Sequence, residues 1–318
     1  MPSPTRTAID NTSMTEPMSV TTVPRGYVHR ASVAEVLLTG WENGTSGSPG
    51  TSDSFTVRAQ WPRSHALFAP AHGYQDPLLL VESIRQTGIL LAHAEYDVPF
   101  DHQFLMWDIA FSATAPALAA GPAPTDVELH TVCEIGRGRT PAGMRYHVRV
   151  LRDGTPVATG GASFSCTRPA VHRRLRGERP TTTGRALPAP IDPAAVGRTD
   201  PRHVLLATAP PSDRGPRWEL RVDTDDPVFF DHPVDHVPGM LLIEAARQAA
   251  RAATGRPDAL LLDLRSTFTR YAELDSTCWI EARAGDGGTA ADLPVRVRGL
   301  QQGEEVFAAE LILRRPDL

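Results

Sequence analysis

Two long, mostly apolar runs, residues 77–94 and 239–253, dominate the hydrophobic pattern of the chain. The few polar residues in each run lie three or four positions apart, a spacing that places them on one face of a helix. The pattern therefore predicts two helices. Because most of each helix surface is apolar, we expect both helices to be buried.

Shorter segments around these helices predict strands, and alternation of apolar and polar residues is clearest in VRVRGL (295–300) and EVFAAELIL (305–313). Each helix is preceded by one predicted strand and followed by several. The predicted strands are 54–61, 103–113, 125–136, 143–152 and 155–166 in the first half, and 217–223, 259–271, 277–284, 293–300 and 304–314 in the second. A long apolar helix followed by a strand meander fits the hot-dog fold, so we predict an α+β double hot-dog.

The two halves also share a motif, Glu-x-x-Arg-Gln, in the middle of each predicted helix. An offset of 162 residues aligns the pairs Phe68 and Phe230, Glu82 and Glu244, Arg85 and Arg247, and Gln86 and Gln248. Two copies of one unit predict a fused pseudo-dimer. We divide the chain into a disordered segment (1–24), an N-terminal hot-dog unit (25–168), a Pro/Arg-rich linker (169–216) and a C-terminal hot-dog unit (217–318).

The composition of the chain excludes several kinds of catalysis and ligand. All 32 basic residues are arginine, which excludes lysine Schiff-base or lysine-base catalysis. The net charge of −5, without a large basic block, argues against nucleic acid as a ligand. The three cysteines lack zinc or disulfide spacing, and we expect no metal and no cofactor. The polar N-terminus does not look like a signal peptide, and no apolar stretch approaches a membrane span, so we expect a cytoplasmic protein.

The polar stripe of the second helix contains Glu244, Arg247 and Gln248. Charged groups on a buried helix need partners, because an unpaired buried charge is costly. A plain surface salt bridge is the simplest alternative. The matching stripe of Glu82, Arg85 and Gln86 on the first helix favours a functional site instead.

The loop before the second helix, DHPVDHVPG (231–239), combines two Asp–His pairs with a Pro-Gly helix start. Backbone N–H groups from Gly239 onward could donate hydrogen bonds to a thioester carbonyl oxygen, as in an oxyanion hole. A nearby histidine could move a proton. We prefer His236, beside Asp235 and close to the helix start, and read His232 as a loop or capping residue.

The corresponding loop of the first half, APAHGYQDP (69–77), is only partly similar. His72 and Asp76 could take the loop roles, but Asp76-Pro77 replaces the Pro-Gly, and His236 aligns with Tyr74. The two sites therefore need not be equivalent, and one could do chemistry while the other binds or stabilises.

Several runs resemble the A-factor biosynthesis family, the γ-butyrolactone synthases of actinomycetes. They are DHVPGMLLIEAARQAA (235–250), FAPAHGYQDPLLLVESIRQTG (68–88), PFDHQFLMWDIAF (99–111), VHRRLRG (171–177) and RYAELDSTCWI (270–280). The resemblance extends from about residue 27 to the C-terminus. It implies transfer of a β-ketoacyl group from an acyl carrier protein or coenzyme A to the hydroxyl of dihydroxyacetone phosphate. The ester then cyclises to a butenolide phosphate, a precursor of signals that control antibiotic production.

The run FFDHPVDHVPGMLLIEA (229–245) also resembles hydroxyacyl-carrier-protein dehydratases, in which a loop histidine and a helix glutamate come from opposite protomers. That resemblance implies His236 near Glu82 and Arg85, and His72 near Glu244 and Arg247. The loop here is shorter, which leaves open which histidine corresponds.

For the implied reaction, Arg247 and Arg85 are candidates for binding the acceptor phosphate, with Gln248 and Gln86 beside them. Glu244 or His236 is the candidate general base. The acyl chain needs an apolar tunnel at a helix–sheet interface. We expect a monomeric pseudo-dimer or a homodimer, with neither nucleic acid nor membrane as a partner.

Two other readings stay open: a hot-dog dehydratase or thioesterase, which would not need dihydroxyacetone phosphate, and a non-catalytic acyl-binding regulator. A linker arginine cluster offers a docking surface for an acidic carrier protein, against the simpler reading of a solvated linker. Its members are Arg168, Arg173, Arg174, Arg176 and Arg179.

Overall fold

Twelve antiparallel strands form one continuous sheet in the part of the chain that the structure describes. The computed structural model describes residues 21–44, 53–135, 141–210, 215–285, 288 and 291–315. From edge to edge the order is β1-β2-β4-β5-β6-β3-β9-β12-β11-β10-β8-β7. Strand for strand, the second half of this order repeats the first in reverse, which is the arrangement expected of two copies of one unit placed edge to edge.

The first half of the sheet is built around α1 (Pro77–Ala94), and its strands are β1 (Leu38–Asn43), β2 (Asp53–Trp61), β3 (Gln103–Ala113), β4 (Thr125–Ile135), β5 (Gly143–Arg152) and β6 (Thr155–Thr167). The second half is built around α3 (Gly239–Thr254), and its strands are β7 (Leu206–Thr208), β8 (Arg217–Leu220), β9 (Leu260–Phe268), β10 (Cys278–Ala284), β11 (Asp292–Gln301) and β12 (Glu304–Arg314). A short helix, α2 (Pro169–Arg176), follows β6.

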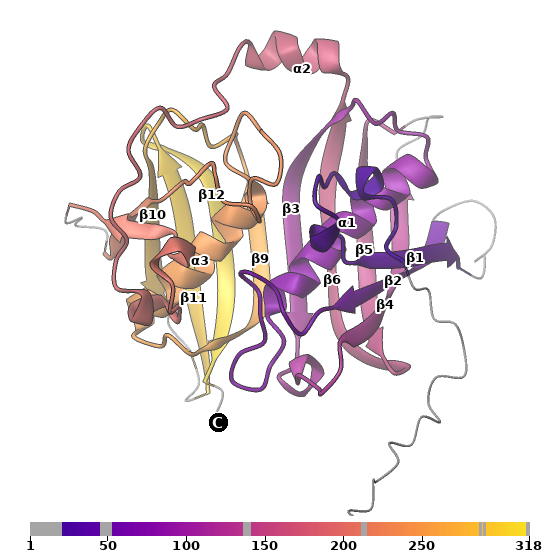
Figure 1. Cartoon of the computed structure of the whole chain (residues 1–318), viewed down its shortest axis with the longest axis horizontal. Coiled ribbons are helices and arrows are strands. Elements are labelled where there is room, and N and C mark those ends of the chain that lie inside the picture. The colour runs from indigo at the N-terminus through magenta and orange to yellow at the C-terminus, as the bar shows by residue number, and fades with distance from the viewer. Residues whose placement is uncertain are drawn as a thin grey trace, which may run out of the picture.

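The two halves meet where β3 pairs with β9 at the centre of the sheet. Ser266 lies opposite Ile109 in this register, and its hydroxyl donates to the Ile109 carbonyl at 2.9 Å. Each long helix packs against its own half, α1 on β3, β5 and β6, and α3 on β10, β11 and β12 (Figure 1). The interface between the halves therefore runs between the two helices.

Both predicted helices and all ten predicted strands are present, with ends that mostly agree within one or two residues. The β8 and β9 strands end three residues earlier than predicted, at Leu220 and Phe268. The short edge strands β1 and β7 were not predicted. The predicted burial of the two helices is confirmed.

Two further expectations concern the segments between and before the units. The segment 169–216, expected to be a linker, contains α2 and β7. Residues 1–20 of the expected disordered segment lie outside the described residues. Val23, near the start of the described chain, is buried, and its N–H donates to the Leu38 carbonyl. No described helix has the length and hydropathy needed to cross a membrane.

The two helices begin differently. The α1 helix has Asp76 as its N-cap, whose carboxylate accepts from the Leu78 N–H at 2.9 Å, and Pro77 follows at the first helical position. The α3 helix starts after Pro238, and no side chain caps its first turn. The first N–H groups of α3 are thus left free of a side-chain acceptor.

Gly88 lets α1 approach β5 closely. A Cβ atom at this position would lie 2.6 Å from the Tyr146 hydroxyl oxygen, which itself donates to the Ile84 carbonyl at 2.7 Å. We expect Gly88→Ala to destabilise the protein by about 1–3 kcal/mol, because overpacking outweighs the gain in helix propensity. Urea unfolding measures this effect. An unfolding midpoint equal to or above that of the wild type would show that α1 can move away from β5.

Candidate functional site

Glu82 of α1 is the centre of a buried ion cluster, here called the first cluster and composed of Glu82, Arg30, Arg85 and Gln86. Arg30 reaches the Glu82 carboxylate at 2.7 Å, Arg85 donates to it at 2.7 and 2.8 Å, and Gln86 donates to it at 2.6 Å. The Gln86 oxygen also accepts from the Leu37 N–H at 3.0 Å. The helix stripe thus fixes the chain that precedes β1.

Glu244 of α3 has the same surroundings in the second cluster, composed of Glu244, Arg198, Arg247 and Gln248. Arg198 reaches its carboxylate at 2.6 Å, Arg247 donates through Nε at 2.8 Å and Gln248 donates at 2.7 Å. The Gln248 oxygen accepts from the Leu205 N–H at 2.8 Å. The repeat therefore includes a second arginine in each half, Arg30 and Arg198, outside the shared motif.

Both glutamates are buried and ionised. Burial alone would raise their pKa values, but Arg30 with Arg85, and Arg198 with Arg247, outweigh it and lower each pKa from 4.5 to about 2. Each carboxylate also accepts hydrogen bonds from its glutamine. This environment stabilises the charged form and opposes proton uptake at neutral pH.

These lowered pKa values predict acid sensitivity. A carboxyl whose pKa is lower in the folded state than in the unfolded state stabilises the fold when the pH is above the unfolded-state pKa. This stabilisation, on the order of 3 kcal/mol per carboxyl, is lost as the pH falls from about 4.5 towards 2. Urea unfolding between pH 7 and 2.5 measures the loss. We expect Glu82→Gln to flatten part of this dependence, and the same slope in wild type and variant would contradict the assignment.

The two clusters differ in whether the helix arginine has a second carboxylate partner besides the glutamate. The Arg247 Nη1 atom pairs with the Asp76 carboxylate at 2.7 Å, and the Arg247 side chain is 1% exposed. The position equivalent to Asp76 in the second loop is Pro238, which offers no carboxylate. The Arg85 side chain is 17% exposed, and its Nη1 has no hydrogen-bond partner among the described residues. Arg85 therefore keeps a free edge, whereas Arg247 does not.

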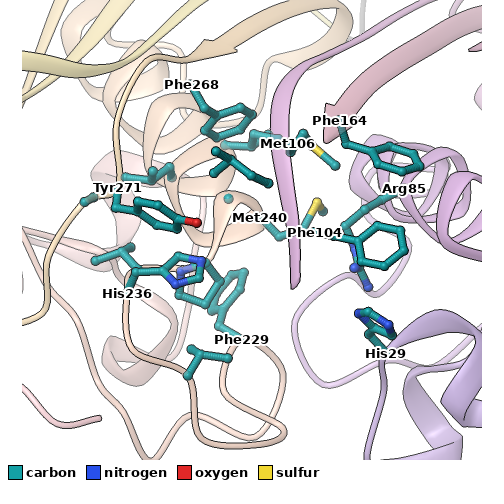
Figure 2. A pocket seen from close by; sticks show the side chains of 18 of the residues that line it. His29, Arg85, Phe104, Met106, Phe164, Phe229, His236, Met240, Phe268 and Tyr271 are labelled. Atoms are coloured by element: carbon teal, nitrogen blue, oxygen red, sulfur yellow. The ribbon is translucent and has the colours of Figure 1, made fainter. Parts of the chain in front are cut away.

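Arg85 lines a cavity of about 240 Å³ between the two halves. Figure 2 shows the first half contributing Arg85, His29, Phe104, Met106 and Phe164, and the second half contributing His236, Phe229, Met240, Phe268 and Tyr271. The lining is apolar in its middle, with Arg85 and His29 towards one wall and His236 and Tyr271 towards the other (Figure 2). Such a lining can hold an acyl chain and present polar groups at its ends.

The loop of the second half reaches this cavity because it is fastened to the first half. The Asp231 carboxylate accepts from the backbone N–H groups of Ala31 at 2.8 Å and Ser32 at 3.3 Å. Arg30 donates to the Val228 carbonyl at 3.1 Å. The same arginine thus supports Glu82 within its own half and holds the opposite loop.

That loop contains two Asp–His pairs, of which Asp231, His232 and His236 line the cavity. The Nδ1 atom of His232 is 2.6 Å from Asp231, and that of His236 is 2.7 Å from Asp235. In each pair the carboxylate accepts the Nδ1–H, which leaves Nε2 as the available base. The His236 side chain is the less exposed of the two.

Arg176 of α2 lies behind the Asp235–His236 pair. It donates to the Asp235 carboxylate at 3.3 Å and to the Asp235 carbonyl at 3.0 Å, and it binds Glu273 at 2.5 Å. Its guanidinium lies 3.8 Å from the centre of the Tyr271 ring, and Tyr271 packs edge-on against His236. The hydrogen bond from His236, together with Arg176, holds the pKa of Asp235 well below its usual range.

A third histidine, His29, also lines the cavity. His93 donates its Nδ1–H to the Val98 carbonyl at 2.6 Å, so its Nε2 accepts from His29 Nε2 at 2.8 Å. Burial, with His93 and Arg85 nearby, lowers the pKa of His29 to about 3. His29 is therefore neutral at physiological pH.

The predicted site residues fall into two groups. Arg85, His236 and Gly239 border the cavity, and Asp235 supports His236 from behind. The other set consists of the cluster residues Glu82, Gln86, Glu244, Arg247 and Gln248, together with the exposed His72, none of which lines the cavity. Asp76, and not His72, is the loop residue that reaches Arg247. His236, expected near Glu82 and Arg85, lines one cavity with Arg85, whereas Glu82 does not border that cavity.

Comparison with known proteins identifies the family. The model of the A-factor biosynthesis hotdog domain matches residues 12–168 and 181–314, which together make up most of the chain. The chain belongs to the A-factor biosynthesis hotdog family. The predicted resemblance and the double hot-dog fold are thus confirmed.

The chain is similar to two relatives that are each named 2-oxo-3-(phosphooxy)propyl 3-oxoalkanoate synthase. The protein from Streptomyces virginiae is 50% identical over 90% of this chain and 96% of its own length, and that from Streptomyces coelicolor is 40% identical over 91% and 90%. Among solved structures, a putative oleoyl thioesterase from Lactobacillus plantarum covers 85% of this chain and 98% of its own at 12% identity and a TM-score of 0.49, a likeness too loose to bear on the reaction.

For this A-factor family member, sequence reasoning missed residues that reach the site from outside the repeated motif. They are His29, Arg30, Arg198 and Tyr271. Arg176 was expected only as part of an exposed arginine cluster, but it is buried and donates to Asp235. One signal was available for Arg176 and Tyr271, because both lie in runs that resemble the family, VHRRLRG and RYAELDSTCWI. Arg30 and Arg198 carry no local pattern, since their partners are 52 and 46 residues away.

Proposed function

We propose that this protein transfers a 3-oxoacyl group from a thioester to the hydroxyl of dihydroxyacetone phosphate, which forms a 2-oxo-3-(phosphooxy)propyl 3-oxoalkanoate. The observation that carries the proposal is the 50% identity, over nearly the whole length of both chains, to a relative of that name. The cavity supports it, because an apolar middle is flanked by a free arginine edge and an Asp–His pair.

In the proposed complex, the acyl chain of the donor lies among the apolar side chains of β3 and α3. The acceptor phosphate binds the free edge of Arg85, since a planar and permanently charged guanidinium suits phosphate oxygens. Glu82 holds that guanidinium through two hydrogen bonds, and Gln86 in turn donates to the Glu82 carboxylate.

His236 is the proposed general base. Its Nε2 takes the proton of the acceptor hydroxyl, whose oxygen attacks the thioester carbonyl carbon. A carbon–oxygen bond forms, the carbon–sulfur bond breaks, and the proton returns from His236 to the leaving sulfur. The uncapped start of α3 at Gly239 and Met240 borders the cavity, so its N–H groups are suited to stabilise the oxyanion of the tetrahedral intermediate.

Glu244 has a structural role in this proposal, although its burial first suggested a base. Two arginines and a glutamine occupy its oxygens and keep it ionised. In the second half, the ion pair between Arg247 and Asp76 takes the place of the free edge of Arg85. Each chain therefore has one working site, made from both halves. A monomer is then sufficient for activity.

The ester product carries an activated methylene next to a ketone, and its closure with loss of water would give the butenolide phosphate of γ-butyrolactone-type signalling. The test is to incubate the protein with a 3-oxoacyl thioester and dihydroxyacetone phosphate and to detect the ester or butenolide phosphate by mass spectrometry. Thioester hydrolysis that is equal with and without the phosphate would instead support the thioesterase alternative.

A further inference from the structure

The α2 helix presents opposite faces to the site and to solvent. Its last residue, Arg176, is buried against Asp235, Glu273 and Tyr271 beside the cavity. On the other side, Val171 and Leu175 are 48% and 77% exposed. These two residues are four positions apart, so they form one apolar strip, with the exposed Arg168 and Arg174 three positions before and after Val171.

A groove extends from this end of α2 to the cavity. Arg179, just beyond α2, lines the groove together with Trp107 of β3. The groove and the cavity share the side chains of Leu105, Phe268, Arg270 and Tyr271. The groove therefore lies next to the cavity, with Tyr271 among the side chains that they share.

We propose that the outer face of α2, composed of Arg168, Val171, Arg174 and Leu175, is the docking surface for an acidic acyl carrier protein. Its thioester-bearing arm then lies along the groove. This inference rests on the proposed function, because it names the form in which the acyl donor arrives. An apolar strip flanked by two arginines complements a surface that offers carboxylates around apolar side chains, and charge attraction of this kind raises the association rate.

A free coenzyme A thioester fits the same groove less well in one respect. It has no extended surface to cover Val171 and Leu175, which are strongly exposed in a protein whose other large apolar side chains are mostly buried. An exposed apolar patch with a charged rim is typical of a protein-binding site. A higher kcat/KM with the coenzyme A thioester than with the carrier-bound thioester would therefore count against the proposal.

The test compares one 3-oxoacyl group on three donors: an acyl carrier protein, coenzyme A and N-acetylcysteamine. We expect the double variant Arg168→Glu/Arg174→Glu, and separately Leu175→Asp, to raise KM for the carrier-bound donor about tenfold or more. The kcat/KM for the N-acetylcysteamine donor should stay within about twofold of the wild type. Equal effects on the two donors, or none on the carrier-bound donor, would overturn the docking surface.

Two control variants sharpen the comparison. Arg265→Glu reverses another exposed arginine, in β9, and should affect no donor. Arg176→Met, on the inner side of α2, should lower kcat with all donors alike, because it acts through Asp235 and His236. If the wild type makes no ester from any donor, the proposed function fails, and this result is distinct from a failure of the docking surface.

Discussion

Replacing His236 by asparagine is expected to lower kcat for ester formation by about 10²- to 10⁴-fold, the range for loss of a general base, with KM values for both substrates little changed. The reason is the fixed Asp235–His236 pair, which presents a basic Nε2 at the cavity. Steady-state kinetics with dihydroxyacetone phosphate and a 3-oxoacyl thioester measures the change.

The neighbouring Asp231–His232 pair supplies the matched control. Asp231 is already engaged by Arg30 and two backbone N–H groups, and His232 is more exposed than His236. We therefore expect His232→Asn to lower kcat by less than about tenfold. A larger loss in the His232 variant than in the His236 variant would transfer the role of base to His232.

Replacing Arg85 by methionine is expected to raise KM for dihydroxyacetone phosphate by about 10- to 100-fold, as for the loss of a charged hydrogen bond, while binding of the acyl donor changes little. Glu82 keeps Arg30 and Gln86 in this variant, so the fold should remain intact. Kinetics at varied acceptor concentration and a thermal unfolding curve measure the two effects.

Arg247→Met is the counterpart at the equivalent position of the repeat, and we expect the opposite result. It leaves the carboxylates of Glu244 and Asp76 without their shared guanidinium, and such losses cost about 3–5 kcal/mol. Unfolding should therefore shift strongly, and the acceptor KM of the remaining folded protein should not. A raised KM for dihydroxyacetone phosphate in Arg247→Met, with an unchanged KM in Arg85→Met, would contradict this assignment. It would place the phosphate beside α3 and not beside α1.

The elements that the sequence predicts well are those with a continuous local signal. The α1 and α3 helices are long apolar runs, and their starts, at Asp76-Pro77 and Pro238-Gly239, are marked by residues that favour helix ends. The α2 helix was missed because Val171 and Leu175 face solvent, so its apolar pattern is too short to stand out from a Pro/Arg-rich segment. The β1 and β7 strands lie at the sheet edges and are short.

The candidate site could be predicted only as far as the repeat extends. The offset between the halves located Arg85, and the loop pattern located His236 with Asp235. The difference between the two halves depends on Asp76, which aligns with Pro238 and neutralises Arg247 across the interface. No spacing in the sequence indicates this contact, because it joins residues 171 positions apart.

The most direct test of the account is a crystal structure of the protein with dihydroxyacetone phosphate. We expect the phosphate within hydrogen-bonding distance of Arg85, inside the cavity between the halves, and the substrate hydroxyl near His236. A phosphate bound beside Arg247 in place of Asp76, with no ligand at Arg85, would contradict it.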